Sequence, residues 1–144
     1  MMDLVFRIFD PADESAVIEL WESCGLTRPW NDPKTDIAIK RNHSPEQFIV
    51  GLIDERIVAS GMAGYDGHRG TVNYLAIDPE FQGKGLGRQL MNEVERILEA
   101  IGCPKVNILF RNENERVLDF YKAIDYTDND CVSMGKRLDG KSQT

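Results

Sequence analysis

The sequence contains few of the residues that build disulfide frameworks and metal centres. It has 3 cysteines, at Cys24, Cys103 and Cys131, and 2 histidines, at His43 and His68. The cysteines are odd in number and widely spaced, and neither histidine joins them in a ligand pattern. This argues against a disulfide scaffold and against a zinc site. We therefore expect no bound metal and a cytoplasmic location.

Excess basic charge and long apolar runs are also missing. Lys and Arg total 17 against 24 Asp and Glu, which gives a net charge of −7 and a pI near 4.8. A general nucleic-acid binder needs a basic face, so this balance argues against one. The N-terminus lacks a basic start followed by an apolar run, so we expect no signal peptide, no membrane segment and no membrane partner. An acidic surface is compatible with an amine substrate but is also common in soluble proteins.

What is present suits one α/β domain. The 144 residues are 42% hydrophobic and 28% charged, enough for one sizeable core. We expect a domain over residues 1–139 and a frayed tail over 140–144. Hydrophobic periodicity and breakers predict a mixed, mostly antiparallel sheet flanked by helices. The expected strands are 4–9, 48–53, 57–63, 71–77, 106–110 and 131–138, and the expected helices are 11–24, 33–42, 86–101 and 112–124.

A glycine-rich loop, Gln82-Gly83-Lys84-Gly85-Leu86-Gly87, joins an apolar strand to an amphipathic helix. Glycines let backbone N–H groups converge, and the following helix adds the positive end of its dipole. Together they predict an anion site, most naturally for phosphate. A P-loop is excluded because its Gly-Lys-Ser/Thr is absent, and the dinucleotide fingerprint fails at Arg88. The alternative is an ordinary glycine-rich turn.

The pattern Gln82-x-x-Gly85-x-Gly87 resembles the acetyl-coenzyme A loop of the GCN5-related N-acetyltransferases (GNAT family). The predicted order of elements also matches the GNAT acyltransferase fold along nearly the whole chain. The resemblance implies acetyl-CoA as co-substrate, with the pyrophosphate held by Gln82, Gly83, Lys84, Gly85, Leu86, Gly87 and Arg88. It also implies that the pantetheine arm bonds to the backbone of Leu75, Ala76 and Ile77.

A second signature lies downstream, where Asn114 and Tyr121 fall on the asparagine and tyrosine of the family pattern. The resemblance implies that Tyr121 protonates the departing coenzyme A thiolate, as a phenol near the sulfur can. It implies that Asn114 bonds the pantetheine arm. Each residue has a structural alternative: a core tyrosine for Tyr121 and a helix N-cap for Asn114. Asp125 replaces the usual capping glycine, so the exit turn is expected to be strained or differently shaped.

The catalytic base is missing from its usual places. Family members use a glutamate at one of two strand positions, which Thr71 and Leu109 occupy here, and neither side chain can act as a base. Asn73 and Asn107 are polar residues in apolar runs, and they either line a water chain or are structural amides. Asp66, His68 and Glu113 occupy loop positions near strand ends; His68 is most often simply a turn residue.

The loop around Arg28 and Trp30 borders the acceptor site in this family, although a buried tryptophan anchoring the loop explains the same residues. Segments 28–33 and 64–70 resemble the uncharacterised bacterial group called YpeA-like. The resulting hypothesis is an N-acetyltransferase that transfers the acetyl group of acetyl-CoA to a primary amine, on a small molecule or a peptide N-terminus, by direct attack. The alternative is an acyl-CoA-binding sensor or interaction module without turnover. A homodimer through the second helix and the last strand is also possible.

Overall fold

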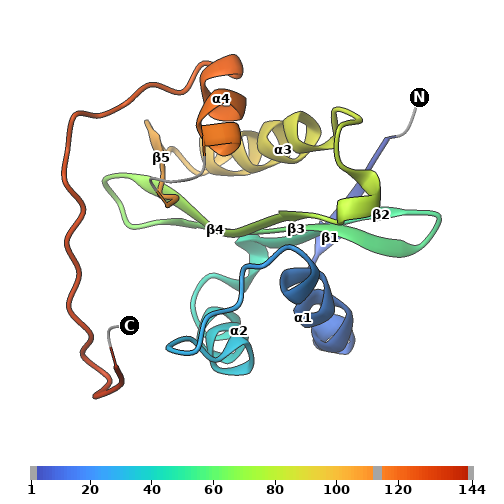
Figure 1. Cartoon of the computed structure of the whole chain (residues 1–144), viewed down its shortest axis with the longest axis horizontal. Helices are drawn as coiled ribbons and strands as arrows, with labels where there is room; N and C mark the ends of the chain where they lie inside the picture. The colour runs from blue at the N-terminus through green and yellow to red at the C-terminus, as the bar shows by residue number, and fades with distance from the viewer. Residues whose placement is uncertain (1–2, 112–114, 143–144) are drawn as a thin grey trace. The chain divides into compact units, whose positions relative to one another are not determined.

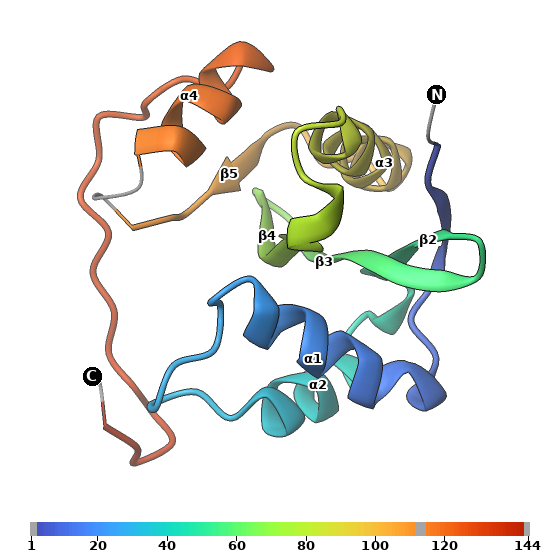
Figure 2. The same ribbon diagram turned by 45° about the vertical axis from the view of Figure 1, so that its right-hand side comes forward.

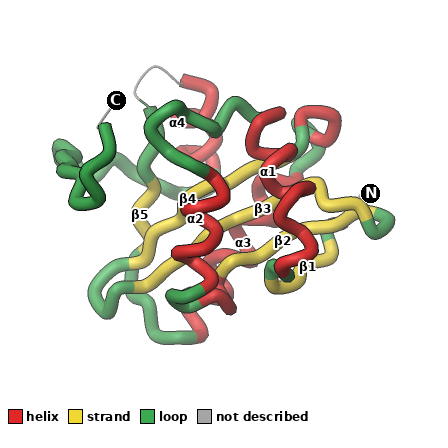
Figure 3. The backbone as a smooth tube through the Cα atoms, turned by 90° about the horizontal axis from the view of Figure 1, so that it is seen from below, coloured by secondary structure: helices red, strands yellow, loops and turns green. Residues whose placement is uncertain are grey.

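The computed structural model describes residues 3–111 and 115–142 and divides the chain into two compact units, Met1–Ile108 and Leu109–Thr144. The first unit contains a five-stranded sheet in the order β1-β2-β3-β4-β5 (Figure 3). Neighbouring strands are antiparallel except β4 and β5, which are parallel. The strands are β1 Val5–Ile8, β2 Phe48–Ile53, β3 Arg56–Tyr65, β4 Gly70–Ile77 and β5 Val106–Ile108.

Helices cover both faces of this sheet. Helices α1 (Glu14–Ser23) and α2 (Pro33–Arg41) lie on one face, and α3 (Leu86–Ala100) lies on the other (Figures 1 and 2). The predicted α2 is confirmed, and its start is fixed by Asp32, whose side chain accepts a hydrogen bond from the Lys34 N–H. Such a cap satisfies an N–H that the helix itself leaves unpaired. Short 3₁₀ turns, η1 (Pro11–Asp13), η2 (Pro45–Gln47) and η3 (Pro79–Phe81), connect the elements.

Each face of the sheet has its own apolar core. On β2, Phe48 and Val50 pack towards α1 and α2, whereas Ile49 packs towards α3. This is the alternation that the two-residue period of a strand requires. On the α1/α2 side the fully buried Trp21 stacks on Tyr74, with ring centroids 3.8 Å apart. The α3 side is aliphatic and built on Leu86, Leu90, Val94 and Leu98.

The second unit contains one helix, α4 (Glu115–Ala123), among its described residues. The chain leaves α4 through Asp125, whose φ of 73° lies in the left-handed region. The Tyr126 N–H then bonds the Tyr121 carbonyl at 2.9 Å, which closes the turn in the way a glycine cap would. The turn is strained, as expected, because Asp125 adopts a left-handed conformation that favours glycine.

One strand prediction was too long and another was wrong. The strand expected over 106–110 forms as β5 but ends at Ile108, and the one expected over 131–138 does not form. Apolar residues alternating with polar ones suggested the latter, but Val132 and Met134 are 88% and 91% exposed and belong to no described sheet. Alternation makes a strand only where the backbone finds a partner and one face is buried. The dimer contact expected from this strand therefore loses its basis.

Candidate active site: a glycine loop and a polar cavity

The glycine-rich loop follows β4 through a well-ordered turn. The Asp78 side chain accepts a hydrogen bond from the Glu80 N–H at 2.9 Å and so starts η3. The Gln82 side chain turns back and donates to the Ile77 carbonyl at 3.0 Å. Gln82 thus ties the loop to the end of β4.

Gly83 and Gly85 adopt φ values of 76° and 79°, which are left-handed conformations that favour glycine. A side-chain carbon added to either residue would meet no protein atom within 4 Å. The left-handed backbone conformation at these two positions therefore favours glycine, and the missing side chains leave open space beside the main chain. Such space lets a ligand approach the N–H groups directly.

The loop ends at the uncapped start of α3. Gly85 is the N-cap and offers no side-chain hydrogen bond, and the first turn carries no acidic residue. Leu86 is 1% exposed and anchors the helix start in the core. Gly87 is the second helical residue, and Lys84 and Arg88 add basic side chains. Unpaired N–H groups, the helix dipole and local positive charge all favour an anion here.

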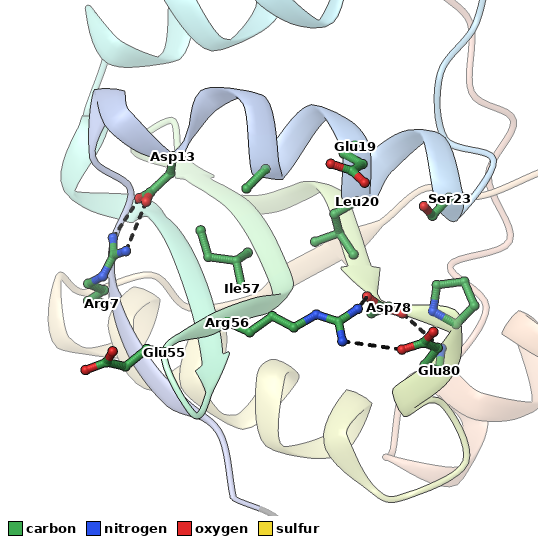
Figure 4. A pocket seen from close by; sticks show the side chains of 12 residues that line it. Arg7, Asp13, Glu19, Leu20, Ser23, Glu55, Arg56, Ile57, Asp78 and Glu80 are labelled. Carbon is green, nitrogen blue, oxygen red and sulfur yellow. Dashed lines mark hydrogen bonds and ion pairs between the residues drawn. The ribbon is translucent and has the colours of Figure 1, made fainter.

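A salt bridge fixes the turn that precedes this loop. The Arg56 guanidinium contacts Asp78 at 2.9 Å and Glu80 at 3.3 Å, and it lies 5.4 Å from the Phe81 ring centroid. These contacts border a cavity of about 690 Å³ next to α1 (Figure 4). Arg7, the other arginine there, is paired with Asp13. Both cations of this acidic cavity are bound to carboxylates, which makes it a poor place for a phosphate ligand.

The edge of β4 is only partly paired. Its ladder with β5 covers Gly70 to Val72 and does not reach Leu75, Ala76 or Ile77. Within the described residues, no strand lies beside these three on that side. An extended ligand arm could therefore pair with this edge. Of these three residues, Ile77 is the least available for such pairing, because its carbonyl already accepts hydrogen bonds from the Gln82 side chain and from the Cys24 thiol.

Strand β4 contains a bulge at Tyr74. Ser60 pairs with Ala76 while Met62 pairs with Asn73, so one extra residue is inserted. Tyr74 has a φ of 50°, which is unusual for a residue with a bulky side chain. The buried Ser60 hydroxyl donates to the Tyr74 carbonyl and accepts from the Trp21 indole N–H, both at 2.9 Å. Strain held in place by surrounding contacts occurs often at functional sites.

A second cavity, of about 460 Å³, opens beside this bulge. Its lining includes Asp36, Ile39 and Lys40 of α2, Met62 of β3, and Asn73 and Tyr74 of β4. We call it the α2 cavity. The Tyr74 hydroxyl donates a short hydrogen bond to the Asp36 carboxylate. Burial and the neighbouring Asp36 carboxylate both raise the pKa of Tyr74 above its ordinary value, so the phenol stays protonated.

Tyr121 lies in the second unit and is 6% exposed. Its ring packs against Phe110, Phe120 and Tyr126, with centroid distances of 5.1 to 5.5 Å. Burial raises the pKa of Tyr121 to about 12. The phenol is therefore protonated at neutral pH, as a proton donor must be. Asn114 and Glu113 lie outside the described residues.

Two of the remaining residues that the sequence suggested for the site, Asp66 and Arg28, hold their own turns or loops together. Asp66 accepts hydrogen bonds from the His68 and Arg69 N–H groups, which lower its pKa, so it closes its own turn. The Arg28 side chain donates to the Gly25 and Thr27 carbonyls.

Of the polar residues predicted on strands, Asn73 borders the α2 cavity. Asn107 and Thr71 pair with each other across β5 and β4.

Sequence reasoning missed the three most informative residues of the α2 cavity, which are Tyr74, Asp36 and Lys40. Tyr74 looks like an ordinary aromatic in a strand, and nothing local marks the bulge. Asp36 and Lys40 share one face of α2 at a spacing of one turn, which was the only available signal. That signal does not distinguish a functional face from a solvated one.

Comparison with known proteins supports one family. The sequence profile described as "Acetyltransferase (GNAT) family" matches residues 14–126. The "Acetyltransferase ECA0875" of Pectobacterium atrosepticum is 47% identical over 132 residues, covering 92% of this chain and 94% of its own. An "Uncharacterized N-acetyltransferase" of Yersinia pestis is 48% identical over the same length and the same shares. Among solved structures, Ard1 from Thermoplasma volcanium has a TM-score of 0.77 at 21% identity, over 88% of this chain and 84% of that one, which shows a shared fold.

Proposed function

The chain belongs to the GNAT acetyltransferase family, and from this premise we propose that it moves the acetyl group of acetyl-CoA to an acceptor amine by direct attack on the thioester. The single observation that best supports a coenzyme site is the pair of left-handed, open glycines, Gly83 and Gly85, at the uncapped start of α3. The alternative function, an acyl-CoA-binding sensor without turnover, was suggested by the absence of a glutamate base at Thr71 and Leu109. Family membership favours an enzyme instead.

In this proposal the coenzyme lies along β4 and over the glycine loop. The pyrophosphate accepts hydrogen bonds from backbone N–H groups between Gln82 and Arg88, because charged acceptors bind such convergent donors well. The pantetheine arm pairs with the edge of β4 at Leu75 and Ala76, beyond the end of the β5 ladder. Asn114 contributes a further contact to the arm, on the strength of the family motif.

The chemical step forms one C–N bond and breaks one C–S bond. The neutral amine attacks the thioester carbonyl carbon, and the coenzyme A thiolate leaves as the tetrahedral intermediate collapses. Tyr121 donates its phenolic proton to that thiolate. With a pKa of about 12 the phenol carries its proton at neutral pH, although burial also makes Tyr121 a weaker acid than an exposed tyrosine. The attacking nitrogen releases one proton to solvent, and the Tyr121 phenolate takes one proton back from solvent, so charge and protons balance over the reaction.

The finer assignments stay predictions. The YpeA-like subgroup rests on segments 28–33 and 64–70, and a cytoplasmic location rests on the cysteine content. The three cysteines are free thiols. Among the described residues, none of the helices combines the length and the apolar composition that a membrane span requires. With the strand at 131–138 absent, only α2, where Ile39 is 62% exposed, still supports a homodimer.

A coenzyme-binding measurement tests the site. Acetyl-CoA at a hundredfold excess over its dissociation constant should stabilise the protein by about 2.7 kcal/mol. Gly85→Asp should remove this shift, because the carboxylate adds bulk and negative charge at the anion site. Gly67→Asp is the matched control, since Gly67 also has a left-handed φ and open space around it but lies in a different turn. A folded Gly85→Asp protein that binds acetyl-CoA as tightly as wild type would show that the loop is misassigned.

Turnover is tested separately with a panel of amines. Free amino acids, polyamines, aminoglycosides, lysine side chains and peptide N-termini are each incubated with acetyl-CoA and the full chain. Acetylated product is detected by mass spectrometry, because three free thiols in the protein complicate assays of released coenzyme A. Acetylation of any member supports the proposed function, and binding without any product contradicts it.

A further inference from the structure

Lys40 is a charged residue in an unusual environment. It is 8% exposed, and among the described residues neither a hydrogen bond nor an ion pair reaches its ammonium group. The Nζ atom lies 3.6 Å from the point where a side-chain carbon at Gly64 would stand, so it is held against the sheet. Burial lowers the pKa of Lys40, and the charge of Glu46 opposes that shift only in part. A largely buried lysine that makes no hydrogen bond or ion pair is stabilised when an anion binds its ammonium group.

Asp36 lies one helical turn before Lys40 and carries the opposite charge. Residues at this spacing on a helix commonly form an ion pair, but these two do not approach within 4.0 Å. Asp36 is instead turned to the Tyr74 hydroxyl at the bulge, while the Lys40 ammonium lies beside Gly64. Both residues line the α2 cavity. The cavity therefore has a negative group and a positive group, each of which could bind an opposite charge on a ligand.

We infer that the α2 cavity selects an acceptor that carries a carboxylate as well as an amine, the chemistry of an amino acid. Lys40 pairs with the carboxylate of the acceptor. Asp36, held by Tyr74, binds the incoming ammonium beside the bulge of β4, and the ammonium releases a proton to solvent before the neutral amine attacks. This selection presupposes the acetyl transfer proposed above, and it adds the class of acceptor that the family assignment leaves open. Ile39 and Met62 supply the apolar part of the lining.

Matched pairs of acceptors test the inference. Each pair contains a free amino acid and its own C-terminal amide, which share the amine and the side chain but differ in charge. We expect the wild-type kcat/KM for the preferred acid to exceed that for its amide by about tenfold or more, as loss of one charged contact predicts. A second pair consists of two peptides that differ only in starting with Glu or Gln. This pair tests whether the carboxylate belongs to a free amino acid or to the acidic first residue of a peptide. The pair with the larger preference identifies the source of the carboxylate.

Variants of α2 connect the preference to Lys40. Lys40→Met should raise KM for the acid until the preference falls to about one, while the amide changes less than about threefold. Lys40→Arg keeps the charge and should keep most of the preference. Lys34→Met removes an exposed lysine from the same helix and should change nothing. Equal wild-type rates for acid and amide, or equal losses for both in Lys40→Met, would overturn the inference.

The amine panel shows whether the proposed acetyl transfer fails, separately from the test of the carboxylate site. If no amine is acetylated, the transfer itself is contradicted, and binding then decides the inference. Thermal shifts are measured for the acid and its amide at saturating coenzyme A, in wild type and in Lys40→Met. A shift from the acid alone, lost in Lys40→Met, supports the carboxylate site. The absence of any wild-type shift with the acid overturns it.

Discussion

The two faces of the sheet carry two kinds of site. On the α3 side the candidate pyrophosphate loop is contiguous in the chain, and its groups are backbone N–H donors made accessible by Gly83 and Gly85. On the α1/α2 side the cavity collects single side chains, such as Asp36, Lys40 and Tyr74, from separate elements. A backbone site serves a ligand that every family member shares, whereas a side-chain site can change one residue at a time. The comparison predicts that loop variants alter coenzyme binding and that side-chain variants alter turnover, selectivity or stability.

The Tyr121→Phe variant should show the largest effect of the variants considered, and the effect should be on turnover. The ring and its packing stay, so coenzyme binding should survive, while turnover should fall by about ten- to ten-thousand-fold if the phenol supplies general acid catalysis. Pre-steady-state rates of acetyl transfer measure this directly. The loss should shrink with an acyl donor whose leaving thiol is more acidic. Equal losses with both donors would assign Tyr121 a positioning role.

Ser60→Ala examines how the bulge is held. The Ser60 hydroxyl bonds the Trp21 indole and the Tyr74 carbonyl, so its removal leaves two polar groups in a buried site. We expect a loss of about 2 kcal/mol in the free energy of unfolding, measured in urea. The stabilisation by acetyl-CoA should change less than in Gly85→Asp, because the loop that holds the pyrophosphate is separate from the bulge. A Ser133→Ala control, at an exposed position, should be neutral. A neutral Ser60→Ala would mean that the bulge does not depend on this pair of bonds.

Lys40→Met should stabilise the protein by about 1 kcal/mol, because a buried cation is replaced by an apolar chain of similar length. The effect depends on pH. The pKa of Lys40 is lower in the folded than in the unfolded state, so its penalty is complete below the folded pKa and disappears as pH rises towards the ordinary value of 10.5. The advantage of the variant should therefore be largest near neutral pH and shrink in alkali. Urea titrations at several pH values check this, and an advantage that grows with pH would contradict it.

The smallest effect concerns the exit from α4. Asp125 holds a φ of 73°, and glycine adopts this conformation without steric penalty. Asp125→Gly should therefore stabilise the protein by about 0.5 kcal/mol, after the higher entropy of glycine in the unfolded chain is deducted. Thermal unfolding would measure it. Coenzyme binding should be unchanged, and a destabilised variant would show that the aspartate side chain contributes more than the backbone strain removes.

The same contrast explains what the sequence allowed us to predict. The glycine loop, the Asp32 cap and α3 were predictable because local signals determine them. The strand at 131–138 was wrong because pairing partners cannot be read from one segment. The α2 cavity was missed because Asp36 and Tyr74 are 38 residues apart and meet only after the bulge has formed.

The bulge at Tyr74 also changes how substitutions along β4 should be interpreted. Val72 packs in the core next to α3 and Ala76 in the core next to α1 and α2, although an even spacing places both on one side of a regular strand. Asn73 and Tyr74, which are neighbours in sequence, both border the α2 cavity. A saturation scan of β4 should therefore show tolerance that alternates with one phase before Tyr74 and the opposite phase after it. Deleting one residue at the bulge would turn the side chains after it to the opposite faces of the sheet, so that each would enter the other core. Insertions and deletions at Tyr74 should therefore be rare among related sequences.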